Sequence, residues 1–222
     1  MIIYTANYGG YDPPVKGAGL YFTDQQAPDG WEDRTFSAPW FDVLPDVGKA
    51  KVLKIFPWLV LGDDWHDCLW VDANIEWRGG QLPDTDFATL EQTCTKSIWR
   101  EFSRLDSNME RKYGLSLKGS YKQQKAHYED YGMQEHDGNS CRTCVVYRRN
   151  TPRVRWICHA WLDEFLSWQN WRDQPALRFV LWQMREHVRL IPQAVGSRWQ
   201  GLDFVLHKHA YGAYSGYENI NV

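Results

Sequence analysis

Apolar residues in this chain fall into short runs that are separated by polar residues, glycine and proline. In the first third of the chain the runs predict strands over residues 2–5, 20–24 and 68–71, and a helix over residues 48–56 that stops at Pro57. Strands that alternate with helices are typical of an α/β sheet with parallel strands. We therefore expect an α/β fold.

The second half of the chain has a less regular pattern, and residues 94–140 are polar and charged. The elements predicted there are a helix start over 83–91, a helix over 120–131, a strand over 143–148, helices over 152–168 and 173–186, and a late strand over 188–195. Pro152 suits the first turn of its helix, where its missing N–H does no harm. Asp173 is a candidate N-cap of the next helix.

The composition indicates a folded protein with a core of ordinary size. The chain has 222 residues, of which 43% are hydrophobic, so we expect a single domain over residues 1–222. The formal net charge of -3 argues against a dedicated binder of polyanions. No apolar run approaches the length of a membrane span, and the N-terminus lacks the pattern of a secretory signal, so we expect a cytoplasmic protein without membrane insertion.

The five cysteines are scattered, which favours reduced thiols over a disulfide framework. Cys141 and Cys144 have C-X-X-C spacing, but the nearest histidines, His127 and His136, are poorly spaced for a zinc site. We interpret this spacing as incidental.

Three predicted strands end on residues that could bind a ligand, namely Thr5, Asp24 and Asp72. Ligands of α/β sheets lie beyond the carboxyl ends of the strands. Asp72 and Asn74 are two residues apart, and alternate side chains of a strand point the same way. Their oxygens suit a hard divalent cation that also binds phosphate. The alternative is an ordinary turn, in which Asp and Asn make local hydrogen bonds.

Several ordered motifs carry a resemblance to a known family. They are YTANYGGYDPP, YFTD, KIFP, LWVDANIEWRGG, VVYRRNTPRVR and WRDQPALRFVLWQ, which together cover about residues 2–80 and 141–185. In order and spacing they resemble a small glycosyltransferase-like family. Its plant members include a mucilage-synthesis protein and one first described as an alkaline ceramidase, and bacterial members are linked to polysaccharide loci.

The resemblance implies a GT-A-like fold, which is a Rossmann-like mixed sheet flanked by helices. It implies transfer of a sugar from a nucleotide-diphosphate donor, a UDP-sugar in the first instance, to a hydroxyl group of a glycan or another acceptor. The donor-binding half would cover about residues 1–80, and the acceptor and catalytic half about residues 81–222.

The donor would lie against the first loop and the strand ends, and the residues implied are Thr5, Ala6, Tyr8, Gly9, Tyr11, Asp24, Lys54 and Asp72. Tyr8 or Tyr11 would stack on the base. Asp24 would accept a hydrogen bond from the base or the ribose. Lys54 would contact the diphosphate. The alternatives are an ordinary turn for the loop and a solvated helix face for Lys54.

The motif WRDQP implies that Asp173 and Gln174 face the reacting sugar. Asp173 would act as a general base for the acceptor hydroxyl, or it would orient the donor sugar. Both roles stay open here, and so does the stereochemistry of transfer. Gln174 would bind sugar hydroxyl groups. Helix capping alone would also explain an aspartate at position 173.

The segment from His209 to Gly212 has the His-X-X-Gly shape found near the C-terminus of several metal-dependent GT-A enzymes. By that resemblance Asp72, Asn74 and His209 would bind Mn²⁺ or Mg²⁺, with phosphate and water as further ligands. His207 is an alternative ligand. Many such enzymes have a second Asp where this chain has Asn74, and an amide oxygen brings no charge to the cation.

Two basic stretches of the sequence are compatible with a second kind of acceptor, which is DNA. Their cationic residues are Lys118, Lys122, Lys125, Arg148, Arg149, Arg153 and Arg155, and the aromatic residues nearby are Tyr121, Tyr128, Tyr131 and Trp156. They would suit a groove for hydroxymethylated DNA, which some viral glycosyltransferases modify. Solvated surface is the plainer alternative. Two other readings are a nucleotide- or glycan-binding protein without turnover and a lipid amidohydrolase, for which we find no nucleophile or cluster of metal ligands.

Overall fold

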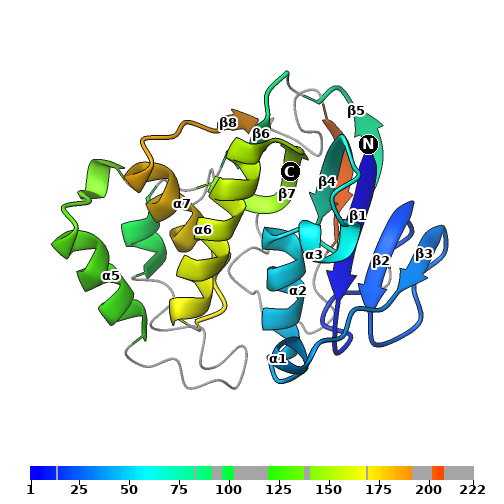
Figure 1. Cartoon of the computed structure of the whole chain (residues 1–222). Coiled ribbons are helices and arrows are strands. Elements are labelled where there is room, and N and C mark those ends of the chain that lie inside the picture. The colour runs from blue at the N-terminus through cyan, green and yellow to red at the C-terminus, as the bar shows by residue number, and fades with distance from the viewer. Residues whose placement is uncertain are drawn as a thin grey trace.

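A seven-stranded sheet forms the centre of the protein, with its strands in the order β3-β2-β1-β4-β7-β6-β8 (Figure 1). The structure is a computed structural model that describes residues 1–13, 15–82, 84–91, 97–102, 120–137, 141–168, 170–191 and 202–207. The strands of this sheet are β1 (Ile2–Asn7), β2 (Gly19–Thr23), β3 (Trp31–Arg34), β4 (Asp67–Val71), β6 (Phe87–Glu91), β7 (Cys141–Arg149) and β8 (Arg189–Ile191).

The strand directions make the sheet mixed. β1 pairs in parallel with β2 and β4, β2 pairs in parallel with β3, and β6 pairs in parallel with β8. β7 runs antiparallel to both of its neighbours, β4 and β6. The predicted α/β class and its mixed sheet are therefore confirmed, and the arrangement is consistent with a Rossmann-like fold. Because β1, β2 and β4 run the same way, their carboxyl ends share one edge of the sheet.

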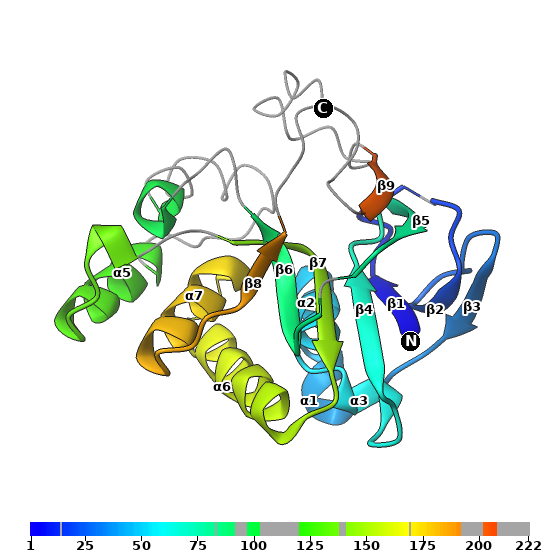
Figure 2. The same ribbon diagram turned by 90° about the horizontal axis from the view of Figure 1, so that it is seen from above.

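Helices cover one face of this sheet, and a small second sheet lies on the other face (Figure 2). The helices are α1 (Pro39–Asp42), α2 (Asp46–Ile55), α3 (Trp58–Leu61), α6 (Pro152–Trp168) and α7 (Asp173–Gln183), with α5 (Ser120–Asp130) and the short 3-10 helix η1 (Glu135–Asp137) farther from the strands. The second sheet pairs β5 (Ile75–Gly80) with β9 (Leu202–Leu206) in antiparallel orientation. None of the helices among the described residues has the length and hydropathy that crossing a membrane requires.

Alternating side chains divide the core between the two faces of the sheet. On β4, Cys68 and Trp70 pack with the helices. Leu69, the residue between them, packs on the opposite face with Phe204 of β9. A third cluster attaches α5 to α7, where the Tyr128 ring stacks on Phe179 with ring centroids 4.0 Å apart.

The elements agree with the sequence pattern except in the centre of the sheet. α6 has the predicted bounds, and α2 covers the helix predicted to stop before Pro57. The helix start predicted over residues 83–91 is wrong, because Phe87–Glu91 forms β6 between β7 and β8. A strand buried on both faces appears in the sequence as a short apolar run, whose periodicity does not separate strand from helix. The strands β3, β5 and β9 were not predicted.

Candidate functional site

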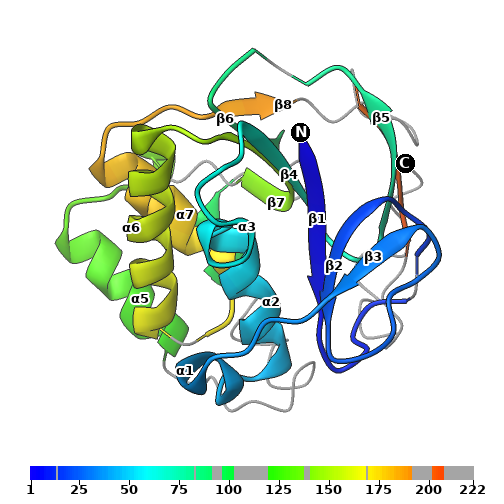
Figure 3. The same ribbon diagram turned by 45° about the vertical axis from the view of Figure 1, so that its right-hand side comes forward.

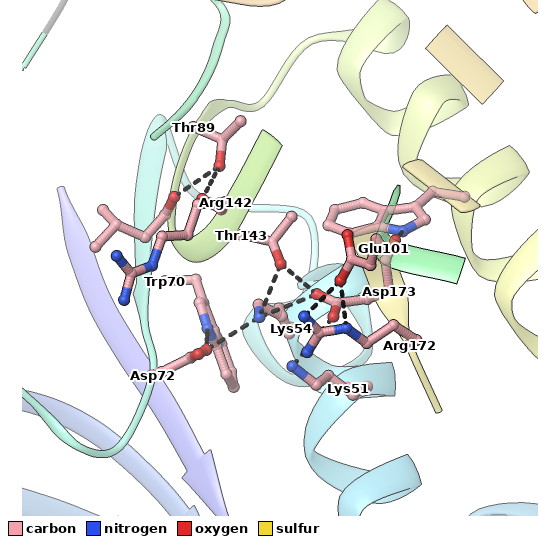
Figure 4. A network of polar contacts seen from close by, with 12 residues as sticks. Lys51, Lys54, Trp70, Asp72, Thr89, Glu101, Arg142, Thr143, Arg172 and Asp173 are labelled. Carbon is pink, nitrogen blue, oxygen red and sulfur yellow. Dashed lines mark hydrogen bonds and ion pairs between the residues drawn. The ribbon is translucent and has the colours of Figure 1, made fainter. Parts of the chain in front are cut away.

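Four elements come together at the carboxyl edge of the parallel strands. α2 lies alongside β1 on the helical face of the sheet (Figure 3). Two lysines one turn apart on α2, Lys51 and Lys54, point toward two aspartates from other elements (Figure 4). Asp72 directly follows β4, and Asp173 is the first residue of α7. Residues from distant parts of the chain thus form one charged cluster.

Lys54 lies at the centre of this cluster, and its side chain is only 1% exposed. Its Nζ is 3.0 Å from Asp72 Oδ1 and 3.0 Å from Asp173 Oδ2. It also donates a hydrogen bond to Thr143 Oγ1 at 3.3 Å. An ammonium group has three N–H donors, so these three acceptors match them one to one. The alternative of a solvated helix face is therefore wrong for Lys54.

Both carboxylate oxygens of the fully buried Asp173 face donors. The Thr143 hydroxyl donates to Oδ2 at 2.6 Å, and Lys51 Nζ lies 3.2 Å from Oδ1. The N-cap of α7 is Arg172, and its side chain makes no capping hydrogen bond with the described residues. The capping role considered for Asp173 is therefore wrong, because its carboxylate is turned toward the lysines instead.

Burial and ion pairing shift the pKa values of the cluster. Burial raises the pKa of a carboxyl group, but Lys51 and Lys54 outweigh it and hold the pKa of Asp173 well below its ordinary value. The pKa of Asp72 is lowered by the same balance between burial and the two lysines. The pKa of Lys51 is raised, because Asp173 and Asp72 outweigh the burial that would lower it. Both aspartates are therefore ionised at neutral pH.

The chain enters α7 through a strained residue. Trp171 has a φ of 58°, a left-handed conformation that is rare for a bulky side chain and costs on the order of 1 kcal/mol. Its ring packs against Gly48 of α2 so closely that a Cβ at position 48 would lie 2.6 Å from it. Arg172 follows, and its Nε donates to Glu101 Oε1 at 2.7 Å. Packing thus holds an unfavourable backbone next to Asp173.

Residues 72–74 form a turn between β4 and β5 rather than a continuation of the strand. The Ile75 N–H donates to the Asp72 carbonyl oxygen at 2.8 Å, and β4 ends one residue before Asp72. The strand geometry assumed for the pair of Asp72 and Asn74 is therefore wrong, and the turn alternative is right about the backbone. The Asp72 side chain is 24% exposed, and its Oδ1 accepts a hydrogen bond from Trp70 Nε1 at 2.7 Å.

Asn74 connects this turn to the end of β9. Its Nδ2 donates to the His207 carbonyl oxygen at 2.8 Å, and the His207 N–H donates to the Asn74 carbonyl oxygen at 2.8 Å. The His207 ring lies 3.4 Å from Glu76 Oε2. Asn74 Oδ1 is buried and has no hydrogen-bond partner among the described residues.

The predicted metal site is only partly covered by the structure. His209 lies outside the described residues. Within the described ranges, no group of three or more His, Cys, Asp and Glu side chains could hold a metal ion. The partly exposed carboxylate of Asp72 and the unpartnered amide oxygen of Asn74 are ligand atoms of the kind that Mn²⁺ or Mg²⁺ takes. The site formed by Asp72, Asn74 and His209 stays a prediction.

The first loop is held by the aspartate at the end of β2. The Gly9 N–H lies 3.0 Å and 3.2 Å from the two carboxylate oxygens of Asp24. Gly9 has a φ of 66°, a left-handed conformation that favours glycine, and a Cβ there would lie 2.3 Å from Asp46 Oδ2 at the start of α2 and would displace that side chain. Asp24, predicted to contact the donor, thus orders the loop predicted to bind it.

The other predicted donor residues differ in exposure. Thr5, Ala6 and Tyr8 are buried, and Tyr11 is half-buried in the loop. The Tyr8 ring packs edge-on against Phe41 with ring centroids 5.7 Å apart. Of the two tyrosines predicted to stack on a base, Tyr11 is therefore the more accessible.

Most of the buried polar side-chain atoms that lack hydrogen-bond partners belong to residues predicted for the site. Among the described residues there are six such side-chain atoms: Thr5 Oγ1, Tyr8 OH, Asn74 Oδ1, Arg148 Nε, Asp173 Oδ1 and Gln174 Oε1. Asp173 Oδ1 has Lys51 as an ion-pair partner. Leaving a buried polar group unpaired costs about 1–3 kcal/mol, so a ligand or water is expected at such atoms. All but Arg148 were predicted as site residues.

The two basic stretches do not form a continuous cationic surface in the described residues. Arg148 is fully buried, and its guanidinium donates to the Lys54 carbonyl oxygen at 2.7 Å. The other arginines have acidic partners, in the pairs Arg149 with Asp84, Arg153 with Glu186 and Arg155 with Asp63. Tyr121 and Tyr128 are buried and cannot stack on a ligand, whereas Tyr131 and Trp156 are exposed. Lys118 lies outside the described residues.

Four residues at the cluster were not predicted as site residues from the sequence, namely Lys51, Thr143, Glu101 and Arg172. A usable signal existed for Lys51, because residues three apart share one face of a helix and Lys54 was already a candidate. Thr143 and Glu101 come from elements whose positions beside α2 and α7 depend on the tertiary fold. No local pattern distinguishes them.

Comparison of the chain with models of known protein families gives no match, and comparison with curated protein sequences gives none either. The geometry of the cluster at the sheet edge is therefore the ground for a functional proposal.

Proposed function

We propose that the protein transfers a sugar from a nucleotide-diphosphate donor, a UDP-sugar in the first instance, to a hydroxyl group of an acceptor. One observation carries this proposal. The buried polar atoms that lack hydrogen-bond partners belong largely to the residues expected to contact the donor and the reacting sugar. A sugar nucleotide offers many hydroxyl, carbonyl and N–H groups, which could satisfy such atoms.

The position of these residues in the fold supports the proposal. Thr5 belongs to β1, Asp72 follows β4, and Asp173 begins α7, which places them at the carboxyl edge where α/β sheets bind their ligands. The mixed sheet with helices on one face is compatible with a GT-A-like fold, which we include in the proposal.

Asp173 would position the two lysines beside the donor rather than contact the sugar or accept a proton. A general base works best with a pKa near the working pH, whereas Lys51 and Lys54 hold the pKa of Asp173 far below neutrality. Both of its oxygens are already engaged by Lys51, Lys54 and Thr143. Gln174 would contact the sugar directly, since its buried Oε1 has no hydrogen-bond partner among the described residues.

Asp72, Asn74 and His209 would hold Mn²⁺ or Mg²⁺. The unpartnered Oδ1 of Asn74 and the partly exposed Asp72 fit this role, and His209 follows His207, whose backbone is bonded to Asn74. When bound, such a cation supplies positive charge to the departing diphosphate. Trp70 and Lys54 would fix the orientation of the Asp72 carboxylate through their contacts with Oδ1.

Donor turnover tests this proposal. The protein is incubated with UDP-, GDP- or dTDP-sugars and Mn²⁺, and release of nucleoside diphosphate is measured for the parent, Asp72→Ala and Asp84→Ala. We expect turnover of at least one donor, a loss of about 100-fold or more in Asp72→Ala, and little change in Asp84→Ala. Asp84 is a suitable control because its side chain is 94% exposed, and its partner Arg149 lies beside Asp67, at the end of β4 opposite to Asp72. Absence of turnover with every donor would contradict the proposal.

A second candidate is a protein that binds a nucleotide or glycan without turnover. The observation that favours it is the charge balance of the cluster, because two lysines already neutralise the two aspartates that catalysis would use. Such a protein would show a thermal shift with one of the donors and no release of nucleoside diphosphate in the parent or in Asp72→Ala.

A further inference from the structure

The two lysines of the cluster are not equally available to a ligand. Lys54 is buried, and its three N–H donors match three acceptors, which are Asp72 Oδ1 and Asp173 Oδ2 at 3.0 Å each and Thr143 Oγ1 at 3.3 Å. A bound anion could reach Lys54 only by displacing one of these partners. Lys54 therefore bridges the carboxylates of Asp72 and Asp173 and has no free donor for a ligand.

Lys51 lies one turn earlier on α2 and has a different environment. Its side chain is 19% exposed, and Asp173 is its one ion-pair partner among the described residues, at 3.2 Å. Burial lowers its pKa, but Asp173 and Asp72 raise it by more, so the ammonium stays charged at neutral pH. An ammonium group has three N–H donors, so Lys51 has donors beyond the one that faces Asp173, and Asp173 fixes its position.

The neighbouring cations, Arg172 and Lys49, pair with other acidic residues. Arg172 donates through Nε to Glu101. Lys49, on the same helix, pairs with Asp46 at 3.5 Å and lies 5.8 Å from the centre of the Tyr8 ring, toward the first loop. Among these cations, Lys51 is the one that combines partial exposure with proximity to both aspartates.

We propose that Lys51, and not Lys54, binds the diphosphate group of the donor. The proposal rests on the proposed function for the identity of the ligand, and it replaces the contact expected for Lys54. Asp173 positions the Lys51 ammonium, and Lys54 keeps Asp173 ionised next to it. The Lys51 ammonium would thus face the ligand next to the turn formed by residues 72–74.

Binding of inorganic pyrophosphate tests the role of Lys51 without requiring turnover. Affinities of the full chain are measured by calorimetry for the parent, Lys51→Gln, Lys51→Arg and Lys49→Gln. We expect Lys51→Gln to bind about 10-fold or more weakly, because a charged hydrogen bond is lost, and Lys51→Arg to stay within about 3-fold of the parent. Lys49→Gln is the matched control, because Lys49 is on the same helix, is 20% exposed and has one ion pair. Equal affinity of Lys51→Gln and the parent would overturn the proposal.

A second measurement uses the unsubstituted protein, so it does not depend on how the variants fold. The side-chain signals of Lys51 and Lys49 next to their ammonium groups are recorded by NMR with and without pyrophosphate. We expect pyrophosphate to shift the Lys51 signal, while the Lys49 signal stays unchanged. A Lys51 signal that does not change at saturating pyrophosphate, or a parent that does not bind pyrophosphate, would count against the proposal.

The two proposals fail in different ways. If pyrophosphate shifts the Lys51 signal but no sugar nucleotide is turned over, the anion site stands and the transferase function is lost. If a donor is turned over with equal kcat/KM by the parent and Lys51→Gln, the transferase function stands and the role of Lys51 is refuted.

Discussion

At the scale of single residues, the defining feature is a lysine that water hardly reaches. Removing an ammonium group from water costs several kcal/mol, and two carboxylates and a hydroxyl group offset part of this cost for Lys54. The carboxylate of Asp173 depends on Lys54 in the same way. Burial still outweighs the two aspartates and lowers the pKa of Lys54. Removal of either charge would leave the other buried without compensation, so we expect both to be needed for a stable fold.

Substitution of Lys54 tests this mutual dependence. Lys54→Met leaves Asp173 buried with less compensating charge, and we expect the free energy of unfolding to fall by about 3–5 kcal/mol. Lys125→Met, which removes an exposed ion pair on α5, should change it by about 0.5 kcal/mol or less. Urea denaturation measures both. Similar values for the two variants would show that the buried cluster does not stabilise the fold.

The lowered pKa of Asp173 predicts a pH dependence of stability. Its folded pKa lies below the ordinary value of 3.8, so its contribution is complete above that value and is lost as the pH falls through and below it. We expect the difference in unfolding free energy between the parent and Asp173→Asn to stay constant from pH 7 to about 5 and to shrink as the pH is lowered further toward 3. Asp72 has a lowered pKa as well and adds to the loss in both proteins. Denaturation curves with a constant difference at all pH values would contradict this account.

At the scale of elements, the contact between α2 and the start of α7 decides where Asp173 lies. Gly48 has no side chain, so α2 and the turn before α7 can approach each other closely. The Trp171 ring packs against Gly48, and the Trp171 backbone is in the left-handed region. Such strain near a charged cluster is frequent at functional sites, because packing elsewhere compensates for it. α2 therefore has two roles, since it carries the lysines and also holds the turn before Asp173.

Gly48→Ala tests the close approach of α2. The new methyl group would meet the Trp171 ring at 2.6 Å. Overpacking of this kind costs about 1–3 kcal/mol, while the better helix propensity of alanine returns up to about 1 kcal/mol, so we expect a net loss of stability. In the double variant with Trp171→Phe the smaller ring should relieve the clash, and a thermodynamic cycle would detect this as coupling. Additive effects would show that the two residues do not constrain each other.

At the scale of the whole molecule, charge pairing limits which acceptors suit the protein. The arginines at positions 149, 153 and 155 each face a carboxylate, and the formal net charge is -3. Affinity for DNA comes mainly from cations that neutralise phosphates, and paired arginines contribute little of it. If the proposed transferase function holds, a small hydroxyl acceptor or a glycan therefore suits the described surface better than DNA does.

This balance of charge predicts weak binding to nucleic acid. We expect the parent protein to bind duplex DNA, with or without hydroxymethylated bases, with a Kd weaker than about 100 µM at about 0.15 M salt. Fluorescence anisotropy with a labelled duplex measures this. Tighter binding, or a gain of hexose or pentose mass on hydroxymethylated DNA in the presence of a sugar nucleotide, would restore DNA as the acceptor.

Local patterns were enough for much of the fold and for selecting three residues of the charged cluster, Lys54, Asp72 and Asp173. The helices α2 and α6, the strand β4 and the α/β class follow from periodicity and from proline and glycine positions, which act over a few residues. Asp72 and Asp173 could be selected because strand ends and helix starts are visible in the sequence. The strand end predicted at Thr5 is wrong, because β1 continues to Asn7. β6 was missed because burial on both faces removes the alternation that identifies a strand.

The relations between these residues were decided only by the tertiary structure. In the sequence Lys54 has the pattern of a surface lysine, and only the packing of α2 against β1 and α6 brings it between the carboxylates of Asp72 and Asp173. The same packing turns the Asp173 side chain away from helix capping and leaves Lys51 partly exposed. Which charges become buried depends on contacts between distant segments, and burial in turn sets their ionisation and their availability to a ligand.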